Sequence, residues 1–304
     1  MRIAVTGGPG QLVLSMAERG APAGHEVIAI GPPALDLSAP EDDAIHAALA
    51  AAFDGLGPDA VVNAAAHTAV DKAESEHDLA FAINAVGAGA VARAAARLEV
   101  PLVHVSTDYV FSGDKAEPYL ETDQTGPTGV YGASKLAGEE AVRASGADYA
   151  ILRTAWVYSP FGANFVKTML RLAESREGLG VVDDQRGCPT SALDLADAVI
   201  AVAVNLKAHS DPGLRGLFHA TGSGEGSWAD LAEAIFATSA ANGGPSARVN
   251  RIATADYPTP ARRPANSRLD CSKLTALHGV RLPHWRHSVE QVTARLVREG
   301  TITS

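Results

Sequence analysis

The first ten residues constrain the fold more than any other part of the chain. A short apolar run, Ile3-Ala4-Val5, leads directly into the turn Thr6-Gly7-Gly8-Pro9-Gly10, and a segment of helical composition follows to about Arg19. Glycines in such a turn let the backbone approach a pyrophosphate, which the free N–H groups of the following helix stabilise. The pattern predicts a strand, a dinucleotide-binding glycine loop and a helix, with an ordinary turn between strand and helix as the alternative.

Beyond this first unit, apolar runs typical of buried strands alternate with helical segments. The strand-like runs cover 27–30, 60–63, 101–105 and 149–153, and a long helical segment covers 79–98. Regular alternation of this kind is typical of a parallel sheet with helices on both faces. The sequence therefore predicts an α/β fold built on a doubly wound parallel (Rossmann-type) sheet.

The alternation loosens after residue 155, which predicts a smaller, discontinuous C-terminal domain. We expect residues 1–155, with return segments near 178–216 and 246–256, to form the dinucleotide-binding domain. The second domain is expected to comprise the remaining segments, which are 156–177, 217–245 and 257–304.

The charge balance narrows the classes of partner. The 304 residues include 25 Lys and Arg against 35 Asp and Glu, a formal net charge of −10, whereas nucleic-acid surfaces need clustered cations. We therefore expect no nucleic-acid partner. Because Arg2-Ile3-Ala4-Val5 enters a strand at once and no apolar run approaches roughly 18 residues, we expect neither a signal peptide nor a membrane partner. Two cysteines without metal-site spacing, Cys188 and Cys271, favour a cytoplasmic protein and assign no metal ligand.

Two further segments are candidates for contact with a dinucleotide. Ala64-Ala65-Ala66 follows a strand and would let a flat cofactor lie against the backbone, although tight helix packing needs the same residues. After the strand 27–30, where an acid often binds the adenosine ribose, the chain has Gly31. Asp36-Leu37 comes slightly later and could reach the adenine end, while a loop carboxylate is otherwise simply solvated.

A phenol and an ammonium lie four residues apart at Tyr131 and Lys135, on one face of any helix that contains both. A neighbouring cation lowers the pKa of a phenol by favouring the phenolate, so Tyr131 could give a proton to a carbonyl oxygen. Ser106 and Thr107 follow the strand 101–105 and could orient that carbonyl, or cap the segment after them. The spacing alone is a weak signal and depends on its context.

With these elements in this order, the chain resembles the extended short-chain dehydrogenase/reductases and, within them, the dTDP-4-dehydrorhamnose reductases. The resemblance covers nearly the whole chain. It rests on seven segments, which are Thr6 to Leu12, Asn63 to Asp71, Ser106 to Phe111, Tyr131 to Glu139, Arg153 to Trp156, Asp184 to Thr190 and Arg263 to Ser267. The segment Ser106 to Phe111 is specific to the subfamily, whereas the glycine loop and the Tyr-Lys pair alone indicate only the superfamily.

This resemblance implies an NAD(P)H-dependent reduction of the 4-keto group of a dTDP-4-dehydro-6-deoxy-L-hexose, giving dTDP-L-rhamnose. It implies that Tyr131 donates the proton, that Lys135 lowers the phenol pKa and binds the cofactor ribose, and that Thr107 holds the ketone oxygen. The cofactor would be NADPH or NADH. We expect a weak preference between them, because residues 20–71 contain no Lys or Arg for a 2′-phosphate and no acid follows Ile30.

The resemblance also implies the binding residues. Those expected to bind the cofactor are Gly7, Gly10, Gln11, Leu12, Asp36, Leu37, Ala64, Ala65, Ala66, Tyr131 and Lys135. Those expected to bind the dTDP-sugar are Val70, Asp108, Tyr109, Trp156, Arg263 and Asn266. The second domain would recognise the dTDP portion. A homodimer, including a metal-linked one, is compatible with the resemblance, but no local carboxylate cluster assigns a metal site.

One departure from the family pattern affects the cofactor loop. Val13 stands where the family has its third glycine, and a β-branched side chain there must either push the first helix outward or find a pocket of compensating small residues. Either outcome is expected to displace the loop N–H groups and weaken cofactor binding. Two alternatives therefore stay open. The first is a non-catalytic regulatory or binding subunit of the same fold, and the second is a reductase of another 4-keto deoxysugar nucleotide.

Overall fold

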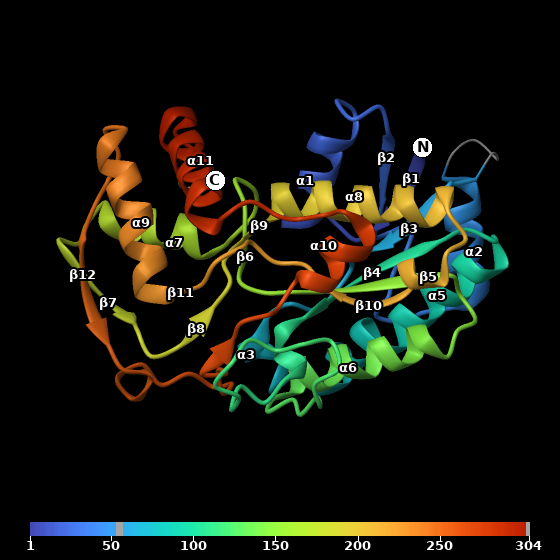
Figure 1. Cartoon of the computed structure of the whole chain (residues 1–304), viewed down its shortest axis with the longest axis horizontal. Coiled ribbons are helices and arrows are strands. Elements are labelled where there is room, and N and C mark those ends of the chain that lie inside the picture. The colour runs from blue at the N-terminus through green and yellow to red at the C-terminus, as the bar shows by residue number, and fades with distance from the viewer. Residues whose placement is uncertain (53–56, 302–304) are drawn as a thin grey trace.

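The computed structural model describes residues 1–52 and 57–301, which form a larger and a smaller lobe (Figure 1). The larger lobe contains a six-stranded parallel sheet in the order β10-β5-β4-β3-β1-β2. Its strands are β1 (Arg2–Thr6), β2 (Glu26–Ile30), β3 (Ala60–Asn63), β4 (Leu102–Thr107), β5 (Tyr149–Thr154) and β10 (Gly216–His219). The strand order reverses between β1 and β3, where open α/β sheets bind their ligands. The predicted doubly wound parallel sheet is confirmed.

Helices cover both faces of this sheet, which is why its strands read as almost continuous apolar runs. The helices on one face are α1 (Gln11–Gly20) and α8 (Ala192–Ala208), and those on the other are α2 (Asp42–Ala51), α5 (Ala88–Arg97) and α6 (Val130–Arg143). Val5 and Val62 point into the first layer, while Ala4 and Val61 point into the second. The alternation along each strand therefore divides the core of the larger lobe into two layers.

The smaller lobe, on the left of Figure 1, packs three helices against a two-stranded parallel sheet. These elements are α7 (Phe165–Ala173), α9 (Trp228–Ala241), α11 (Trp285–Glu299), β7 (Gly178–Val182) and β12 (Arg248–Ile252). The remaining short strands are β6 (Val157–Tyr158), β8 (Arg186–Gly187), β9 (Thr190–Ser191), β11 (Gly226–Ser227) and β13 (Asn266–Ser267). The remaining helical segments are α3 (Val70–Ala73), α4 (His77–Phe81), η1 (Ala82–Gly87), η2 (Asp108–Val110), η3 (Pro212–Leu214), η4 (Thr254–Asp256) and α10 (Ser272–His278).

The division of the chain between the lobes differs from the expected boundaries. Residues 178–182 and 248–252 pair with each other in the smaller lobe, whereas the sequence assigns both stretches to the dinucleotide-binding domain. Conversely, residues 216–219 add the edge strand β10 to the large sheet, and Leu274 and Leu282 lie in the core of the larger lobe. A strand-like pattern indicates that a segment is buried in a sheet, but it does not say in which of two sheets.

One continuous helical stretch, His77–Arg97, is long and apolar enough to cross a membrane by length and composition, with a mean hydropathy of 1.5. The expectation that no apolar run approaches this length is therefore wrong for this segment. Its apolar composition has a different cause, because 61% of the 18-residue window that meets this criterion is buried inside the protein, against α6, α2 and the sheet.

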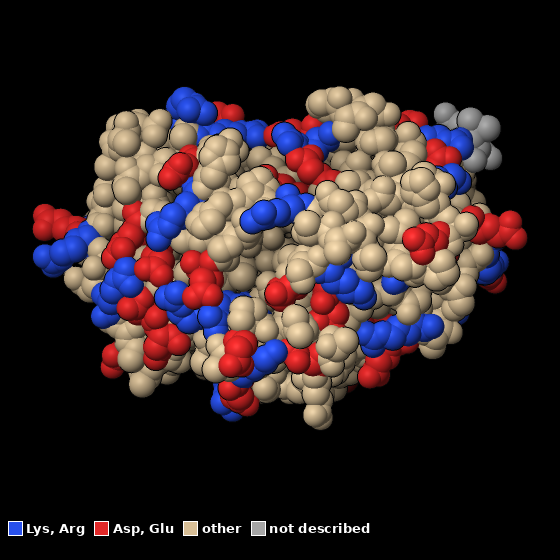
Figure 2. All heavy atoms as spheres, viewed as in Figure 1, with Lys and Arg blue, Asp and Glu red and all other residues tan. Residues whose placement is uncertain are grey.

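Basic and acidic side chains lie next to one another on the face shown in Figure 2. Ion pairs account for part of this mixing, as where Arg251 contacts Asp183, Asp230 and Glu233. The visible charge pattern is therefore mixed rather than concentrated in a single basic area.

Candidate active site

A cleft of about 820 Å³ opens at the carboxyl ends of β1, β3 and β4. Most of the residues implied by the resemblance line it together. These are Gly7, Gly10, Gln11, Leu12, Ala64, Ala65, Ala66, Val70, Thr107, Tyr109, Tyr131 and Lys135. A glycine loop and a Tyr-Lys pair more than 100 residues apart in the chain thus share one cavity.

The glycine loop is shaped for close approach of a ligand backbone. Gly7 has a φ of 128°, which side chains rarely allow, and a Cβ added there would lie 3.4 Å from the backbone of Ala65. A Cβ at Gly31 would lie 2.7 Å from the Gly7 carbonyl oxygen, which explains why the residue after β2 is a glycine and not the acid sought there. Helix α1 begins beyond Gly10 with no side-chain cap, so its first N–H groups face the cleft and fit a pyrophosphate.

The Val13 side chain packs in the core next to the glycine loop, and its effect on cofactor binding stays a prediction. This side chain is 4% exposed and belongs to the core beneath the sheet, with one methyl carbon 3.4 Å from the position of a Cβ on Gly7. Helix α1 accommodates the branched side chain while the loop still lines the cleft.

The pKa of the Tyr131 phenol is raised, against the expectation that Lys135 lowers it. Burial raises this pKa to about 12, a hydrogen bond with Thr107 opposes the increase, and the charge of Asp108 adds to it. Lys135 is 2% exposed and its Nζ donates to the Val105 carbonyl at 2.7 Å. Burial lowers the pKa of this ammonium to about 8, while Glu139 opposes the decrease. Near pH 7, Tyr131 is therefore a protonated phenol and Lys135 is mainly a cation.

Asp108 lies behind Thr107 and does not line the cleft, which differs from its expected role as a substrate contact. Its carboxylate is 3% exposed and accepts a hydrogen bond from the Thr107 hydroxyl at 2.9 Å. Burial raises the pKa of Asp108 to about 6. Tyr109, in contrast, does line the cleft, with its ring edge-to-face to Tyr131 at a centroid distance of 5.5 Å.

Buried polar groups fix the strand ends under the cleft. The Thr6 hydroxyl donates to Asn63 Oδ1 at 2.6 Å, and Asn63 Nδ2 lies 3.1 Å from His104 Nδ1. Burial and, secondarily, Lys135 lower the pKa of His104 well below its ordinary value, so its ring is neutral at neutral pH. Asn84, on the π-helix η1, accepts from the backbone N–H of His67 and donates to Ser134, and so connects the cofactor side of the cleft to α6.

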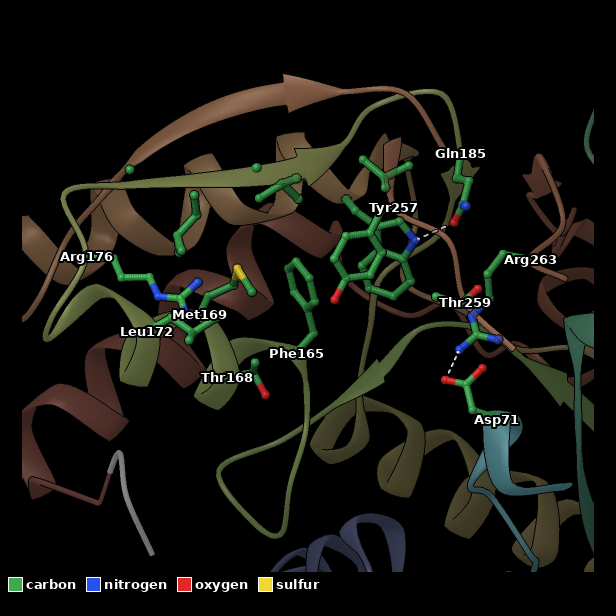
Figure 3. Close-up of a pocket in the computed structure, with 16 residues that line it drawn as sticks. Asp71, Phe165, Thr168, Met169, Leu172, Arg176, Gln185, Tyr257, Thr259 and Arg263 are labelled. Atoms are coloured by element: carbon green, nitrogen blue, oxygen red, sulfur yellow. Dashed lines mark hydrogen bonds and ion pairs between the residues drawn. The ribbon is translucent and has the colours of Figure 1, made fainter. Parts of the chain in front are cut away.

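A second pocket of about 450 Å³ lies in the smaller lobe (Figure 3). Its aromatic lining comes from Phe165, Trp228 and Tyr257, and a guanidinium is present at each end, from Arg176 and Arg263. This combination of aromatic faces and cations fits a base and a diphosphate.

Arg263 is held in this pocket by its neighbours. Its Nη2 donates to Asp71 Oδ2 at 2.8 Å, as the dashed line in Figure 3 shows. Arg262, in contrast, is 70% exposed and lies 4.0 Å from Asp114, outside the pocket. Of these two adjacent arginines, only Arg263 is therefore a candidate for binding a diphosphate in the pocket.

The cleft and the pocket meet at two points along the backbone. Val70 lines the cleft and Asp71 lines the pocket; Asn164 lines the cleft and Phe165 lines the pocket. Asn164 caps α7 through its side chain, which accepts from the Lys167 N–H. The two cavities are thus held in fixed relation by neighbouring residues of the same segments.

Four other predicted contacts lie outside both cavities. Asp36 is exposed and accepts from the N–H and hydroxyl of Ser38, while Leu37 is buried in the core. Asn266 is 6% exposed, and its amide is fully used by the backbone at 115 and 117 and by Arg268.

Trp156 is the fourth, and it supports the pocket from behind. Its ring stacks on Trp228 at 3.7 Å, and Gly187 leaves room for its other side, where a Cβ would lie 2.4 Å from the ring. Its φ of 50° is strained for a tryptophan, at the point where the chain leaves the large sheet.

Sequence reasoning missed several residues that line the cleft, among them Val105, Thr154, Asn164 and Leu195. Thr154 pairs in register with Thr107 on the adjacent strand, so a strand alignment could have identified it. Within residues 1–52 and 57–301, no three His, Cys, Asp or Glu side chains form a group that could hold a metal ion.

The chain is similar to known proteins over nearly its full length. A protein-family model described as RmlD substrate binding domain matches residues 1–298. A dTDP-4-dehydrorhamnose reductase of Sinorhizobium fredii is 49% identical over 300 residues, covering 99% of each chain. A dTDP-4-dehydrorhamnose reductase structure from Clostridium acetobutylicum superposes with a TM-score of 0.87 at 38% identity, covering 97% of this chain and 99% of that one. The Bacillus anthracis enzyme of the same name, solved in complex with NADP, gives a TM-score of 0.86 at 34% identity, with the same coverage.

Proposed function

Because this chain belongs to the RmlD substrate binding domain family, with relatives named dTDP-4-dehydrorhamnose reductase, we propose that it reduces the 4-keto group of dTDP-4-dehydrorhamnose to give dTDP-L-rhamnose. The observation that carries this proposal is the shared cleft of the glycine loop, Thr107, Tyr131 and Lys135. An adjoining pocket with aromatic and cationic lining supports a nucleotide-linked substrate.

NADPH or NADH supplies the hydride when bound, and the cleft residues fit either. The uncapped N-terminus of α1 and the glycine loop would hold the pyrophosphate, while Ala64-Ala65-Ala66 leaves space beside the backbone. We expect comparable use of the two cofactors, because residues 20–71 contain no cation for a 2′-phosphate.

Side chains of the cleft would provide the proton and stabilise the charge that develops during the reduction. Tyr131 has a pKa of about 12, so it remains protonated near pH 7 and can donate to the C4 oxygen as the carbonyl is reduced. The Thr107 hydroxyl lies beside the phenol and would orient the ketone oxygen. The Lys135 ammonium, on the same helical face, would bind the cofactor ribose and stabilise the phenolate left after proton transfer.

The second pocket supports placement of the nucleotide in the smaller lobe. Phe165 and Trp228 offer aromatic faces to the base, and Arg263 offers charge-assisted hydrogen bonds to the diphosphate. The junction at Val70 and Asp71 would then direct the sugar towards Tyr131.

The decisive assay is oxidation of NADPH or NADH by the purified protein with dTDP-4-dehydrorhamnose, made by epimerisation of the 4-keto precursor. We expect dTDP-L-rhamnose as the product, identified by NMR from its C4 configuration. A C4 epimer would favour a reductase of another deoxysugar. Binding of dTDP and NADPH without any turnover would favour the non-catalytic subunit.

We also place the reaction in the cytoplasm, which agrees with two cysteines that are both free thiols. Formation of a homodimer and the lack of nucleic-acid and membrane partners stay predictions. Light scattering of the purified chain, with and without Mg²⁺, tests the dimer directly.

A further inference from the structure

Glu139 is a fully buried carboxylate on the face of α6 that packs against the sheet, and both of its oxygens are fully used. Oε1 accepts from Ser106 Oγ and Arg153 Nε, each at 2.7 Å. Oε2 accepts from Arg153 Nη2 at 2.7 Å and from Arg143 Nη2 at 3.0 Å. The side chain does not line the cleft.

The partners of Glu139 lie next to the residues that form the cleft. Ser106 directly precedes Thr107 at the end of β4, and Arg153 precedes the cleft residue Thr154 at the end of β5. Ser106 and Arg153 are themselves register partners in the sheet. One carboxylate therefore connects α6 to two adjacent strands at the level of the reacting groups.

We propose that Glu139 is a positioning residue for the reduction. Its carboxylate fixes the Lys135-bearing face of α6 against the ends of β4 and β5 and keeps a negative charge one helical turn from the Lys135 ammonium. This inference rests on the proposed reductase function. It assigns to Glu139 an effect on catalysis that is separate from holding the fold together.

The charges around Lys135 support this assignment. Tyr131 and Glu139 face it from α6, and His104 faces it from β4. Burial lowers the pKa of Lys135 to about 8, and Glu139 is the charge that opposes this loss of the proton. His104 is neutral above its depressed pKa, so it supplies no opposing charge at neutral pH.

Three other ionisable groups in this region have pKa values away from that of Lys135, and these are His219, Tyr131 and Asp108. Arg143 and Arg153 form ion pairs with the Glu139 carboxylate, and burial lowers the pKa of His219 on β10 to about 4. The pKa of Tyr131 is about 12 and the pKa of Asp108 is about 6. An alkaline decrease in activity near pH 8 therefore reports on Lys135.

The test is the pH dependence of kcat/KM for the full chain with NADPH and dTDP-4-dehydrorhamnose, in wild type and Glu139→Gln. We expect the alkaline decrease to move down by about one pH unit, as for the loss of a nearby opposite charge. Near pH 8 the variant would then be roughly fivefold less active than wild type, approaching tenfold near pH 9, with recovery to within a few-fold near pH 6. A folded Glu139→Gln protein with an unchanged pH profile would overturn the proposal.

Arg143→Met is the matched control. It removes the partner of the same carboxylate whose side chain is 38% exposed and leaves the buried pair with Arg153 intact. Surface ion pairs contribute little, so we expect a wild-type pH profile and melting temperature. A profile shifted as far as that of Glu139→Gln would count against a specific role of the buried carboxylate.

Glu139→Gln leaves Arg153 buried without its counter-charge, which can prevent folding. The double variant Glu139→Met/Arg153→Met removes both charges and preserves side-chain volume, a replacement that is often neutral for stability. We expect it to fold and to show the same downward shift of the alkaline decrease. A stable double variant with the wild-type profile would contradict the proposal, whereas an inactive wild-type protein would contradict the proposed function instead.

Discussion

At the scale of single residues, Lys135 is assigned a role in catalysis but costs folding stability, because its ammonium is buried. Its pKa falls from 10.5 to about 8 on folding, so the folded state disfavours the charge that catalysis needs. This destabilisation is fully present below about pH 8 and disappears as the pH rises towards 10.5. Lys135→Met should therefore lose activity while gaining roughly 1–3 kcal/mol of stability near pH 7.

Chemical denaturation at pH 7 and pH 10 measures this effect. The gain should shrink at the higher pH, because the wild-type amine is then neutral in the folded protein and the pH approaches 10.5, the pKa of the amine in the unfolded chain. A Lys135→Met protein less stable than wild type at pH 7 would show that the hydrogen bond to Val105 outweighs the cost of the buried charge.

Substitution of Tyr131, also a change at a single residue, should affect proton transfer without affecting cofactor binding. Tyr131→Phe removes only the hydroxyl, so we expect kcat to fall by about 10²–10⁴-fold, the usual contribution of a general acid. The affinity for NADPH, measured by calorimetric titration, should stay within a few-fold. Near wild-type turnover by this variant would show that another group provides the proton.

At the scale of elements, α1 shows how packing can absorb a departure from a motif. Val13 fills core space and touches the loop at Gly7, so Val13→Gly should destabilise the protein by about 2–4 kcal/mol, through lost burial and a more flexible helix. NADPH affinity should change by no more than a few-fold, since the loop already lines the cleft. A thermal melt and a titration with NADPH check both parts, and tenfold tighter binding would restore the expectation that Val13 weakens the site.

The elements also show where sequence reasoning is strong and where it ends. The strand, glycine loop and helix at the N-terminus and the Tyr131–Lys135 helix follow from local patterns, and the structure has both. The side-chain orientations of Asp36 and Asn266 cannot be predicted from local patterns. Asp36 accepts a hydrogen bond within its own turn, and Asn266 donates to backbone groups that are distant in the sequence. The orientation of the Asp108 side chain cannot be predicted from local patterns either, since only the tertiary fold turns its carboxylate away from the cleft.

At the scale of the whole molecule, the proposed division of the substrate between the two lobes can be tested with two adjacent arginines. Arg263 lines the pocket of the smaller lobe, whereas Arg262 is exposed outside it. Arg263→Met should raise KM for the dTDP-sugar roughly ten- to hundredfold, as expected for lost charge-assisted hydrogen bonds. NADPH affinity should not change.

Arg262→Met is the control, with KM expected within twofold of wild type. Initial-rate measurements with varied dTDP-sugar decide between the two positions. Equal effects of both substitutions would mean that general positive charge, rather than the position of Arg263 beside Asp71, attracts the substrate.

The two cavities meet at Val70–Asp71 and at Asn164–Phe165, and this arrangement would select substrates by the length of the link between base and sugar. At each point, consecutive residues line the cleft and the pocket, so the two cavities adjoin. In the proposed binding mode this restricts the distance between the base and the reacting carbonyl. A sugar linked through one phosphate would reach the same base site and hold its carbonyl short of Tyr131. The length of the phosphate linkage would thus select substrates independently of any contact with the hydroxyl groups of the sugar.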